Sequence, residues 1–214
     1  MRKGLGELFQ KSAGGGGKDE PVHMEETSLA ESNNLDPTDW SPDGRHLLFS
    51  TLLFNNQLWV LPLGSAGGDA KPFRFLDSSA DQMHGNFSPD GHFVAYSSNE
   101  SGRFEVHVQT FPISDRKWQI STTGGFEPRW RADGRELYYL SEDRKLMAVS
   151  VSPGPSFGVP EVLFQTRVLP GVTAQRVRFV PARDGKRFLI NTQTGEPPPN
   201  PITVVLNWTS GLKK

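Results

Sequence analysis

Short apolar runs recur along the chain, and each follows an Asp-Gly pair. The runs are Leu47-Leu48-Phe49, Phe93-Val94-Ala95-Tyr96, Leu137-Tyr138-Tyr139-Leu140 and Phe188-Leu189-Ile190. A continuous apolar run of strand length is typical of a strand that is buried on both faces. Farther along the second unit the pattern changes, and Glu105, His107 and Gln109 alternate with apolar residues. Alternation predicts a strand with one solvated face, so we expect His107 to lie on that face.

The Asp-Gly pairs mark an internal repeat. Each follows an aromatic residue and a short spacer, and the four copies contain Asp43-Gly44, Asp90-Gly91, Asp133-Gly134 and Asp184-Gly185. The aspartates are 47, 43 and 51 positions apart. A spacing of about 45 residues is typical of a β-propeller blade. One aromatic residue recurs per copy, so we expect this set to pack between blades: Trp40, Phe87, Trp130 and Phe179.

The residue types around each Asp-Gly pair indicate a tight turn. In Ser-Pro-Asp-Gly, proline presets the backbone for a type I turn, aspartate accepts nearby N–H groups, and glycine adopts positive φ. We therefore interpret the four aspartates as closing hairpins, not as catalytic or metal-binding groups. The third copy has Arg131-Ala132 in place of Ser-Pro, and the fourth has two extra residues before Asp184. We expect looser turns in these two copies.

The repeat predicts an all-β fold, a partial β-propeller of about four to five four-stranded antiparallel blades. It forms a single domain over 1–214, with a partial N-terminal blade at 5–26, blades at 37–76, 84–121 and 127–165, and a partial C-terminal blade at 176–208. A partial propeller leaves two blade faces without a neighbour. The chain then closes into a small ring through its N-terminal strands, associates through the open blade faces, or folds poorly alone.

Composition excludes several classes of function. The 214 residues include 23 Lys and Arg against 24 Asp and Glu, so the net charge of −1 lacks the basic excess of a nucleic-acid binder. The absence of cysteine excludes disulfides and thiolate zinc sites. No apolar run approaches the length of a membrane span, and the N-terminus lacks the apolar core of a signal peptide. We expect no cofactor and no metal, and the compartment stays open.

The repeat units resemble those of TolB-like, WD-repeat-like β-propellers. The resemblance extends to the C-terminal propeller region of bacterial receptor-like serine/threonine protein kinases. It rests on Pro37-Thr38-Asp39-Trp40-Ser41-Pro42-Asp43-Gly44, Leu58-Trp59-Val60-Leu61-Pro62-Leu63, His84-Gly85-Asn86-Phe87-Ser88-Pro89-Asp90-Gly91, Lys117-Trp118-Gln119-Ile120-Ser121, Glu127-Pro128-Arg129-Trp130-Arg131 and Pro201-Ile202-Thr203-Val204-Val205-Leu206-Asn207-Trp208. It implies a propeller outside the cytoplasm that senses a partner. The kinase motifs themselves, a Gly-rich loop, His-Arg-Asp and Asp-Phe-Gly, do not occur in the sequence.

These observations, with the resemblance, favour a non-catalytic binding or sensing module that recognises a protein, a peptide or an envelope component. The resemblance implies that this module is the C-terminal part of the sensor domain of a signalling kinase. A stand-alone TolB-like envelope interaction protein is the alternative. An accessory propeller of a peptidase is a second one, although the Gly-x-Ser-x-Gly elbow of a serine hydrolase is absent.

Candidate ligand-binding residues follow from blade topology. Loops that enter the blades from the face opposite the Asp-Gly turns carry Asp81, His84 and Glu127. Residues of the first strand of each blade face the central axis, where Arg129, Arg176 and Arg178 are placed to bind an anion or a carboxylate. Alternatively, these arginines pair with Asp or Glu or meet solvent. The five histidines are scattered, so no pair has metal-ligand spacing.

Overall fold

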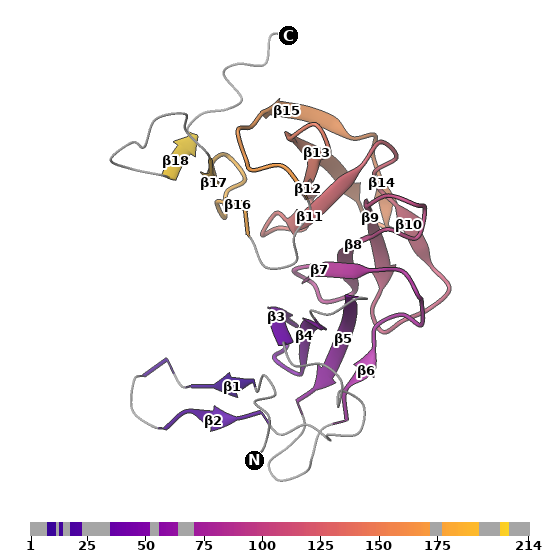
Figure 1. Cartoon of the computed structure of the whole chain (residues 1–214), viewed down its shortest axis with the longest axis vertical. Coiled ribbons are helices and arrows are strands. Elements are labelled where there is room, and N and C mark those ends of the chain that lie inside the picture. The colour runs from indigo at the N-terminus through magenta and orange to yellow at the C-terminus, as the bar shows by residue number, and fades with distance from the viewer. Residues whose placement is uncertain are drawn as a thin grey trace.

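The computed structural model describes residues 8–11, 13–14, 18–22, 35–51, 56–63, 71–171, 177–192 and 202–205. These residues form strands and turns and contain no helix, so the all-β prediction is confirmed. All strand pairs are antiparallel, and each strand pairs with a neighbour close to it in sequence (Figure 1). This topology suits the sequence, because short apolar strands joined by Gly- and Pro-containing turns pair locally.

Three sheets with the same order of strands make up most of the molecule. Blade 1 consists of β3 (Leu35–Trp40), β4 (His46–Thr51), β5 (Gln57–Pro62) and β6 (Phe73–Arg74). Blade 2 consists of β7 (Gln82–Phe87), β8 (Phe93–Ser98), β9 (Glu105–Thr110) and β10 (Lys117–Gln119). Blade 3 consists of β11 (Gly125–Trp130), β12 (Glu136–Ser141), β13 (Lys145–Ser152) and β15 (Glu161–Gln165), with the short β14 (Ser156–Phe157) on the far end of β13.

Smaller sheets lie at the two ends. Blade 4 consists of β16 (Phe179–Pro181), β17 (Phe188–Asn191) and β18 (Ile202–Val205). The N-terminal hairpin consists of β1 (Phe9–Gln10) and β2 (Glu20–Pro21), which pair only with each other in the described part of the chain.

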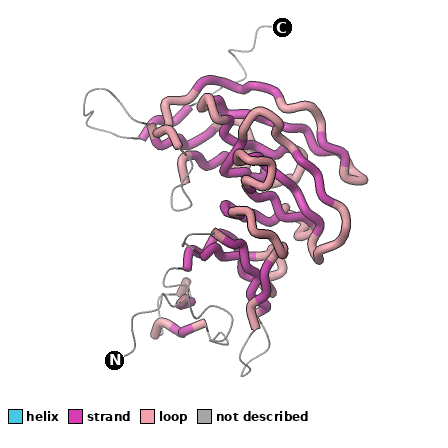
Figure 2. Tube along the Cα trace, turned by 45° about the vertical axis from the view of Figure 1, so that its right-hand side comes forward, coloured by secondary structure: helices cyan, strands magenta, loops and turns pink. Residues whose placement is uncertain are grey.

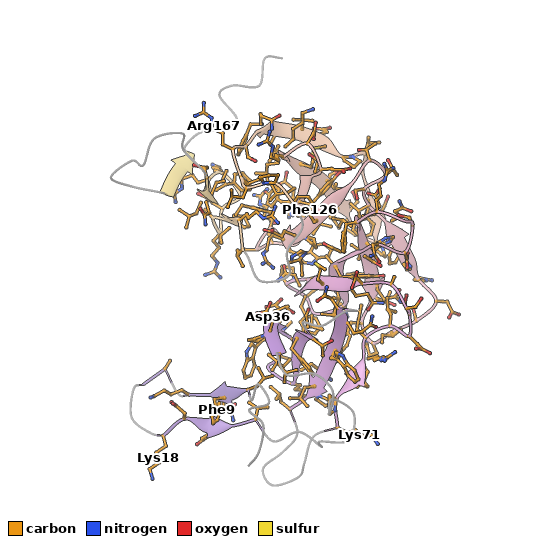
Figure 3. The ribbon with its side chains drawn as sticks, in the orientation of Figure 1. Phe9, Lys18, Asp36, Lys71, Phe126 and Arg167 are labelled. Carbon is orange, nitrogen blue, oxygen red and sulfur yellow. The ribbon has the colours of Figure 1, made fainter. Side chains whose placement is uncertain are left out.

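The blades stand side by side in an arc, with the first strand of each blade on the inner side (Figures 1 and 2). The N-terminal hairpin lies at one end of the arc and blade 4 at the other, and the two ends lie apart. In Figure 3, Asp36 of β3 and Phe126 of β11 lie toward the inner side of the arc, whereas Lys71, just before β6, lies at its periphery. The arrangement is that of a partial propeller.

Each blade has two faces, and the apolar core lies between blades. We call the face toward the next blade in sequence the trailing face, and the face toward the preceding blade the leading face. Trailing residues of blade 1 pack on leading residues of blade 2, as Leu48 does on Val94. Blades 2 and 3 meet in the same way, and so do blades 3 and 4, where Tyr138 contacts Phe188 at a ring-centroid distance of 5.0 Å.

The third strand of blade 2 contradicts one sequence-based expectation. The side chains expected on a solvated face, Glu105, His107 and Gln109, are between 1% and 2% exposed. His107 is packed beside Tyr96, its partner across β8 and β9, whose ring stacks on the imidazole. The opposite face of β9, with Val106 and Val108, is covered by the leading face of blade 3. Polar residues alternate here because they form a buried polar layer, not because they meet water.

Candidate functional site

The Asp-Gly turns have one shape in all four copies. The glycine N–H donates to the carbonyl oxygen three residues earlier over 2.8–2.9 Å, and the glycine φ lies between +67° and +74°. The expectation of looser turns in the third and fourth copies is therefore wrong. In the fourth copy Pro181, not Phe179, takes the strand position of Trp130, since Pro181 pairs with Phe188 as Trp130 pairs with Leu137.

The turn carboxylates bind their own turns. Asp43 and Asp90 each accept a hydroxyl hydrogen bond over 2.5 Å, from Ser41 and Ser88 respectively. Each of the four also accepts one backbone N–H two residues later, over 3.0–3.1 Å. The Ser41 hydroxyl is the main reason that the pKa of Asp43 is lowered, followed by the Arg45 N–H. All of these bonds end on Oδ1, so one oxygen of each carboxylate serves turn closure.

The turns of successive blades line up on one face of the molecule. A Cβ atom placed on Gly91 would lie 3.5 Å from Pro42 of the preceding turn, and one on Gly134 would lie 3.8 Å from Pro89. We call the surface formed by these turns the Asp-Gly face.

Three of the candidate ligand residues occupy the same repeat position, six residues before the turn aspartate. His84, Glu127 and Arg178 are 4%, 0% and 3% exposed. His84 and Glu127 have positive φ values of 59° and 55°, next to bulges in β7 and β11. Positive φ is strained for residues other than glycine, so the local fold is held by tertiary contacts. Ser97 supplies one: its Oγ lies 3.2 Å from His84 Nδ1 and accepts the Glu127 N–H over 3.2 Å.

Glu127 and Arg178 join blade 3 to blade 4. Arg178 Nε lies 2.9 Å from Glu127 Oε1, and the Arg178 backbone N–H donates to Oε2 over 2.9 Å. The guanidinium also donates to the Leu169 carbonyl and lies over the ring of Phe126, 4.9 Å from its centroid. Burial raises the pKa of Glu127, and the N–H and charge of Arg178 oppose that rise. The arginine is used inside the protein, as the alternative interpretation expected.

A second row of contacts runs along the inner strands, at positions three and four residues before the turn aspartates. Asp39 of blade 1 accepts the Asn86 side-chain amide over 2.7 Å and the Phe87 N–H over 2.8 Å. The Asn86 carbonyl in turn accepts the Trp130 indole N–H over 3.1 Å. Burial raises the pKa of Asp39, and these donated hydrogen bonds oppose the rise. The row ties blade 1 to blade 2 and blade 2 to blade 3.

Asp81 has the same kind of role at the opposite end of the strands. Its Oδ1 accepts the Asn56 N–H over 2.7 Å, and its Oδ2 accepts the Asn99 side-chain amide over 3.0 Å. Asn56 belongs to the loop between β4 and β5 of blade 1, so the carboxylate bridges two blades.

Arg129 is the remaining described arginine of the predicted channel set, since Arg176 lies outside the described residues. It lies on the inner strand β11 near two carboxylates, Asp39 and Glu127. Burial lowers its pKa and these two charges raise it. The local charges therefore balance, with Asp39 and Glu127 against Arg129 and Arg178. In the described segments no group of three or more His, Asp or Glu side chains is placed to hold a metal ion.

A surface pocket of about 720 Å³ opens on the Asp-Gly face between blades 2 and 3. It lies between the Asp90 and Asp133 turns and the turn that joins β13 to β14. Its apolar wall consists of Pro89, Phe93, Trp130, Ala132, Val151, Pro153 and Pro155. Volumes of about 300–1,000 Å³ are usual for ligand pockets, so this space has room for a peptide side chain or a small ligand.

Sequence reasoning missed this pocket. It combines the turn of one blade, the turn of the next and a β13–β14 turn that has no counterpart in the described residues of the other blades. The local signal was Pro153-Gly154-Pro155, an extra turn after an overlong third strand. Such an insertion predicts a loop, whereas its position beside two other turns comes only from the packing of the blades.

Comparison with known proteins identifies the fold. No protein-family model and no curated protein matches the chain. Among solved structures, a putative TolB from Agrobacterium tumefaciens superposes with a TM-score of 0.62 at 19% identity, covering 86% of this chain and 62% of that one. TolB from Acinetobacter baumannii gives 0.60 at 17% identity, covering 83% and 41%. The Cps50 (Swd1) β-propeller domain of Myceliophteria thermophila gives 0.52 at 11% identity, covering 80% and 70%.

The chain thus has the fold of a TolB-like β-propeller, and it spans less than two thirds of the length of either TolB chain. Similar structures include enzymes as well, among them an oligogalacturonate lyase, so the fold by itself does not assign a reaction. In the described residues, no helix has the length and apolar character needed to cross a bilayer.

Proposed function

We propose that the chain belongs to a non-catalytic β-propeller module that binds a protein or peptide ligand through the pocket on the Asp-Gly face. The observation that carries the proposal is that polar candidate residues serve contacts between blades, whereas the pocket is open to solvent. Asp81, Glu127 and Arg178 are occupied in contacts between blades. The pocket, in contrast, combines an aromatic and proline wall with an open rim.

The chemistry of the pocket favours an extended peptide segment. Aromatic and proline surfaces bind extended, proline-containing segments, which lose little conformational entropy on binding. Asp90 at the rim is exposed and has no ion-pair partner in the described part of the chain. A carboxylate in this position favours a ligand with a basic side chain next to its apolar part.

A display experiment tests this function. A phage library of random peptides is panned against the full chain, and the enriched peptides are measured against two variants. Ser152→Trp fills the pocket from its rim, and Asp77→Trp places the same side chain at an exposed position of blade 1. We expect the first variant to weaken binding about tenfold or more, or about 1.4 kcal/mol, and the second to leave it unchanged. Equal binding of the peptides by both variants would show that the pocket is not the binding site.

We further propose that this binding module is the sensing region of a receptor-like serine/threonine kinase. The resemblance of the Ser-Pro-Asp-Gly units to that family supports the proposal. The test is the DNA sequence upstream of the Met1 codon, where an in-frame kinase domain and membrane helix are expected.

The alternative is a TolB-like envelope protein that acts through protein contacts, which the likeness to two TolB structures favours. An upstream export signal with no kinase would support this alternative instead.

A further inference from the structure

The pocket on the Asp-Gly face contains a repeat position that has a larger side chain at the preceding blade junction. The backbone N–H of Phe111 donates to the His92 carbonyl, and the N–H of Val151 donates to the Arg135 carbonyl. His92 and Arg135 each stand two residues after a turn aspartate. Phe111 and Val151 are therefore the same position of the repeat, at the end of the third strand of the blade.

Phe111 fills the junction between blades 1 and 2. Its ring lies edge-on to His46 of blade 1 and to Phe87 of blade 2, at centroid distances of 5.0 and 5.1 Å. Edge-to-face contacts of this kind stabilise aromatic rings beyond the area that they bury. The ring is thus held between the two blades, where it also packs against their shared apolar core.

The junction between blades 2 and 3 has the same positions but a smaller side chain. Phe93 is equivalent to His46, three residues after the turn aspartate. Trp130 is equivalent to Phe87, three residues before the turn aspartate. Both line the pocket together with Val151. A valine lacks the ring that the first junction has at this position, so the space between the two aromatic residues stays open.

Phe157 of β14 does not take the place of the missing ring. Its backbone pairs with Val151, and its ring lies 5.5 Å from that of Trp118 in blade 2 and 6.5 Å from that of Trp130. Neither Phe157 nor Trp118 lines the pocket. The aromatic surface that an occupant of the pocket meets is therefore that of Phe93 and Trp130.

We infer that the pocket binds an aromatic side chain of the ligand, which packs between Phe93 and Trp130 as Phe111 packs at the first junction. The inference rests on the proposed function, since it names the side chain that anchors a bound peptide. Asp90 lies exposed at the rim, so the ligand segment carries a basic residue next to its aromatic one.

Small aromatic and aliphatic probes test this preference. N-acetyl-phenylalanine amide and N-acetyl-leucine amide are titrated into the full chain, and the shift of the Trp130 indole N–H signal is followed by NMR. Probes of this size are expected to bind with dissociation constants of about 1 mM. We expect the phenylalanine probe to bind about fivefold tighter, because only a ring makes edge-to-face contacts with Phe93 and Trp130. Equal affinities of the two probes would overturn the inference.

Two valine substitutions locate the site at which the probe binds. Val151→Phe supplies the ring that Phe111 supplies at the first junction, so it is expected to weaken binding of the phenylalanine probe about tenfold or more. Val159→Phe is the matched control, because Val159 is 82% exposed in the β14–β15 loop and does not line the pocket. Melting curves establish that both variants are folded. Wild-type affinity in folded Val151→Phe would overturn the inference.

Phe111→Val gives the reciprocal test and does not depend on the folding of Val151→Phe. It opens the equivalent space between blades 1 and 2, so the phenylalanine probe is expected to bind there as well. The measurement is the NMR shift of the Phe87 backbone N–H on addition of the probe, which is expected in this variant and not in the wild type. An unmoved Phe87 signal in the folded variant would contradict the equivalence of the two junctions, on which the inference depends.

The probe titrations and the display experiment can fail separately. Enriched peptides that contain no aromatic residue and bind less tightly to Ser152→Trp would support the proposed function and overturn this inference. A preference for the phenylalanine probe that Val151→Phe removes would support the inference in the absence of any enriched peptide.

Discussion

Blade 2 and blade 4 carry the same repeat unit but differ in how their second strands are buried. In β8 of blade 2, Val94, Ala95 and Tyr96 are all fully buried, whereas β17 of blade 4 alternates between buried Phe188 and Ile190 and exposed Leu189. The sequences are equally apolar, so the difference comes from the neighbours. Blade 2 has a blade on each side, and blade 4 has a described neighbour only on its leading side. A continuous apolar run therefore indicates a strand suited to burial on both faces. The exposed fraction of its side chains shows whether a blade is present on each of those faces.

The contact that holds blade 4 gives the largest expected effect. Arg178→Met leaves Glu127 buried without its direct ion-pair partner, and removal of one partner of a buried ion pair costs about 3–5 kcal/mol. The measurement is the free energy of unfolding in urea. The control is Lys145→Met, which breaks an exposed pair with Asp143 and is expected to cost less than about 1 kcal/mol. Similar costs for the two variants would contradict the assignment of Glu127 and Arg178 as the main polar link to blade 4.

A matched pair of leucines sharpens the comparison of inner and terminal blades. Leu48 and Leu189 occupy the same repeat position, at 0% and 44% exposure. Leu48→Ala leaves a cavity between blades 1 and 2 and is expected to cost about 2–5 kcal/mol in the free energy of unfolding. Leu189→Ala, measured on monomeric protein, is expected to cost less than about 1 kcal/mol. Equal costs would mean that the trailing face of blade 4 is covered in solution.

The buried histidine of blade 2 predicts a pH dependence. Burial lowers the pKa of His107; Glu100 and Glu105 favour its protonation and Lys117 opposes it. The unfolded chain therefore binds a proton near pH 6.5 that the folded chain does not, so stability decreases as the pH falls below about 6.5. We expect His107→Phe, compared with wild type, to reduce the loss of melting temperature between about pH 7.5 and pH 5.5.

His92 provides the control, because it is exposed in the turn of the same blade. His92→Phe is expected to leave the pH dependence of the melting temperature as it is in wild type. An unchanged pH dependence in His107→Phe would show that water reaches the third strand of blade 2.

The turns predict the smallest difference between the blades. Among the described residues, Asp90 accepts two hydrogen bonds, from the Ser88 hydroxyl and the His92 N–H, whereas Asp184 accepts one, from the Lys186 N–H, and forms a long exposed ion pair with Arg187 over 3.9 Å. Asp90→Ala is expected to cost about 1 kcal/mol in the free energy of unfolding, and Asp184→Ala less. Thermal melts of the two variants measure the difference. A larger cost for Asp184→Ala would contradict this ranking.

The sequence predicts the fold class well because its signals are local. The conformation of Ser88-Pro89-Asp90-Gly91 depends on four adjacent residues, and its recurrence indicates the blade. The register of the fourth copy was harder to predict. The aromatic pattern selects Phe179 as the match, whereas the turn closes from Ala182 and places Pro181 at that position.

The polar residues were less predictable, because their roles depend on contacts between blades. His107 alternates with apolar residues as a surface residue does, yet the ring of Tyr96 stacks on it and its side chain is buried. Glu127 and Arg178 are 51 positions apart, and nothing in their local sequence shows that they meet. The pocket of the Asp-Gly face has the same origin, since three turns from separate positions in the sequence form it.

The polar row from Asp39 through Asn86 to Trp130 has a consequence for how such a protein evolves. Each residue of the row recognises only the adjoining unit, so no contact encodes the total number of units. Gain or loss of a whole unit by recombination disturbs a single junction and leaves the others intact. Selection can therefore change the size of the assembly in steps of one repeat, while the turns and inner strands stay as they are.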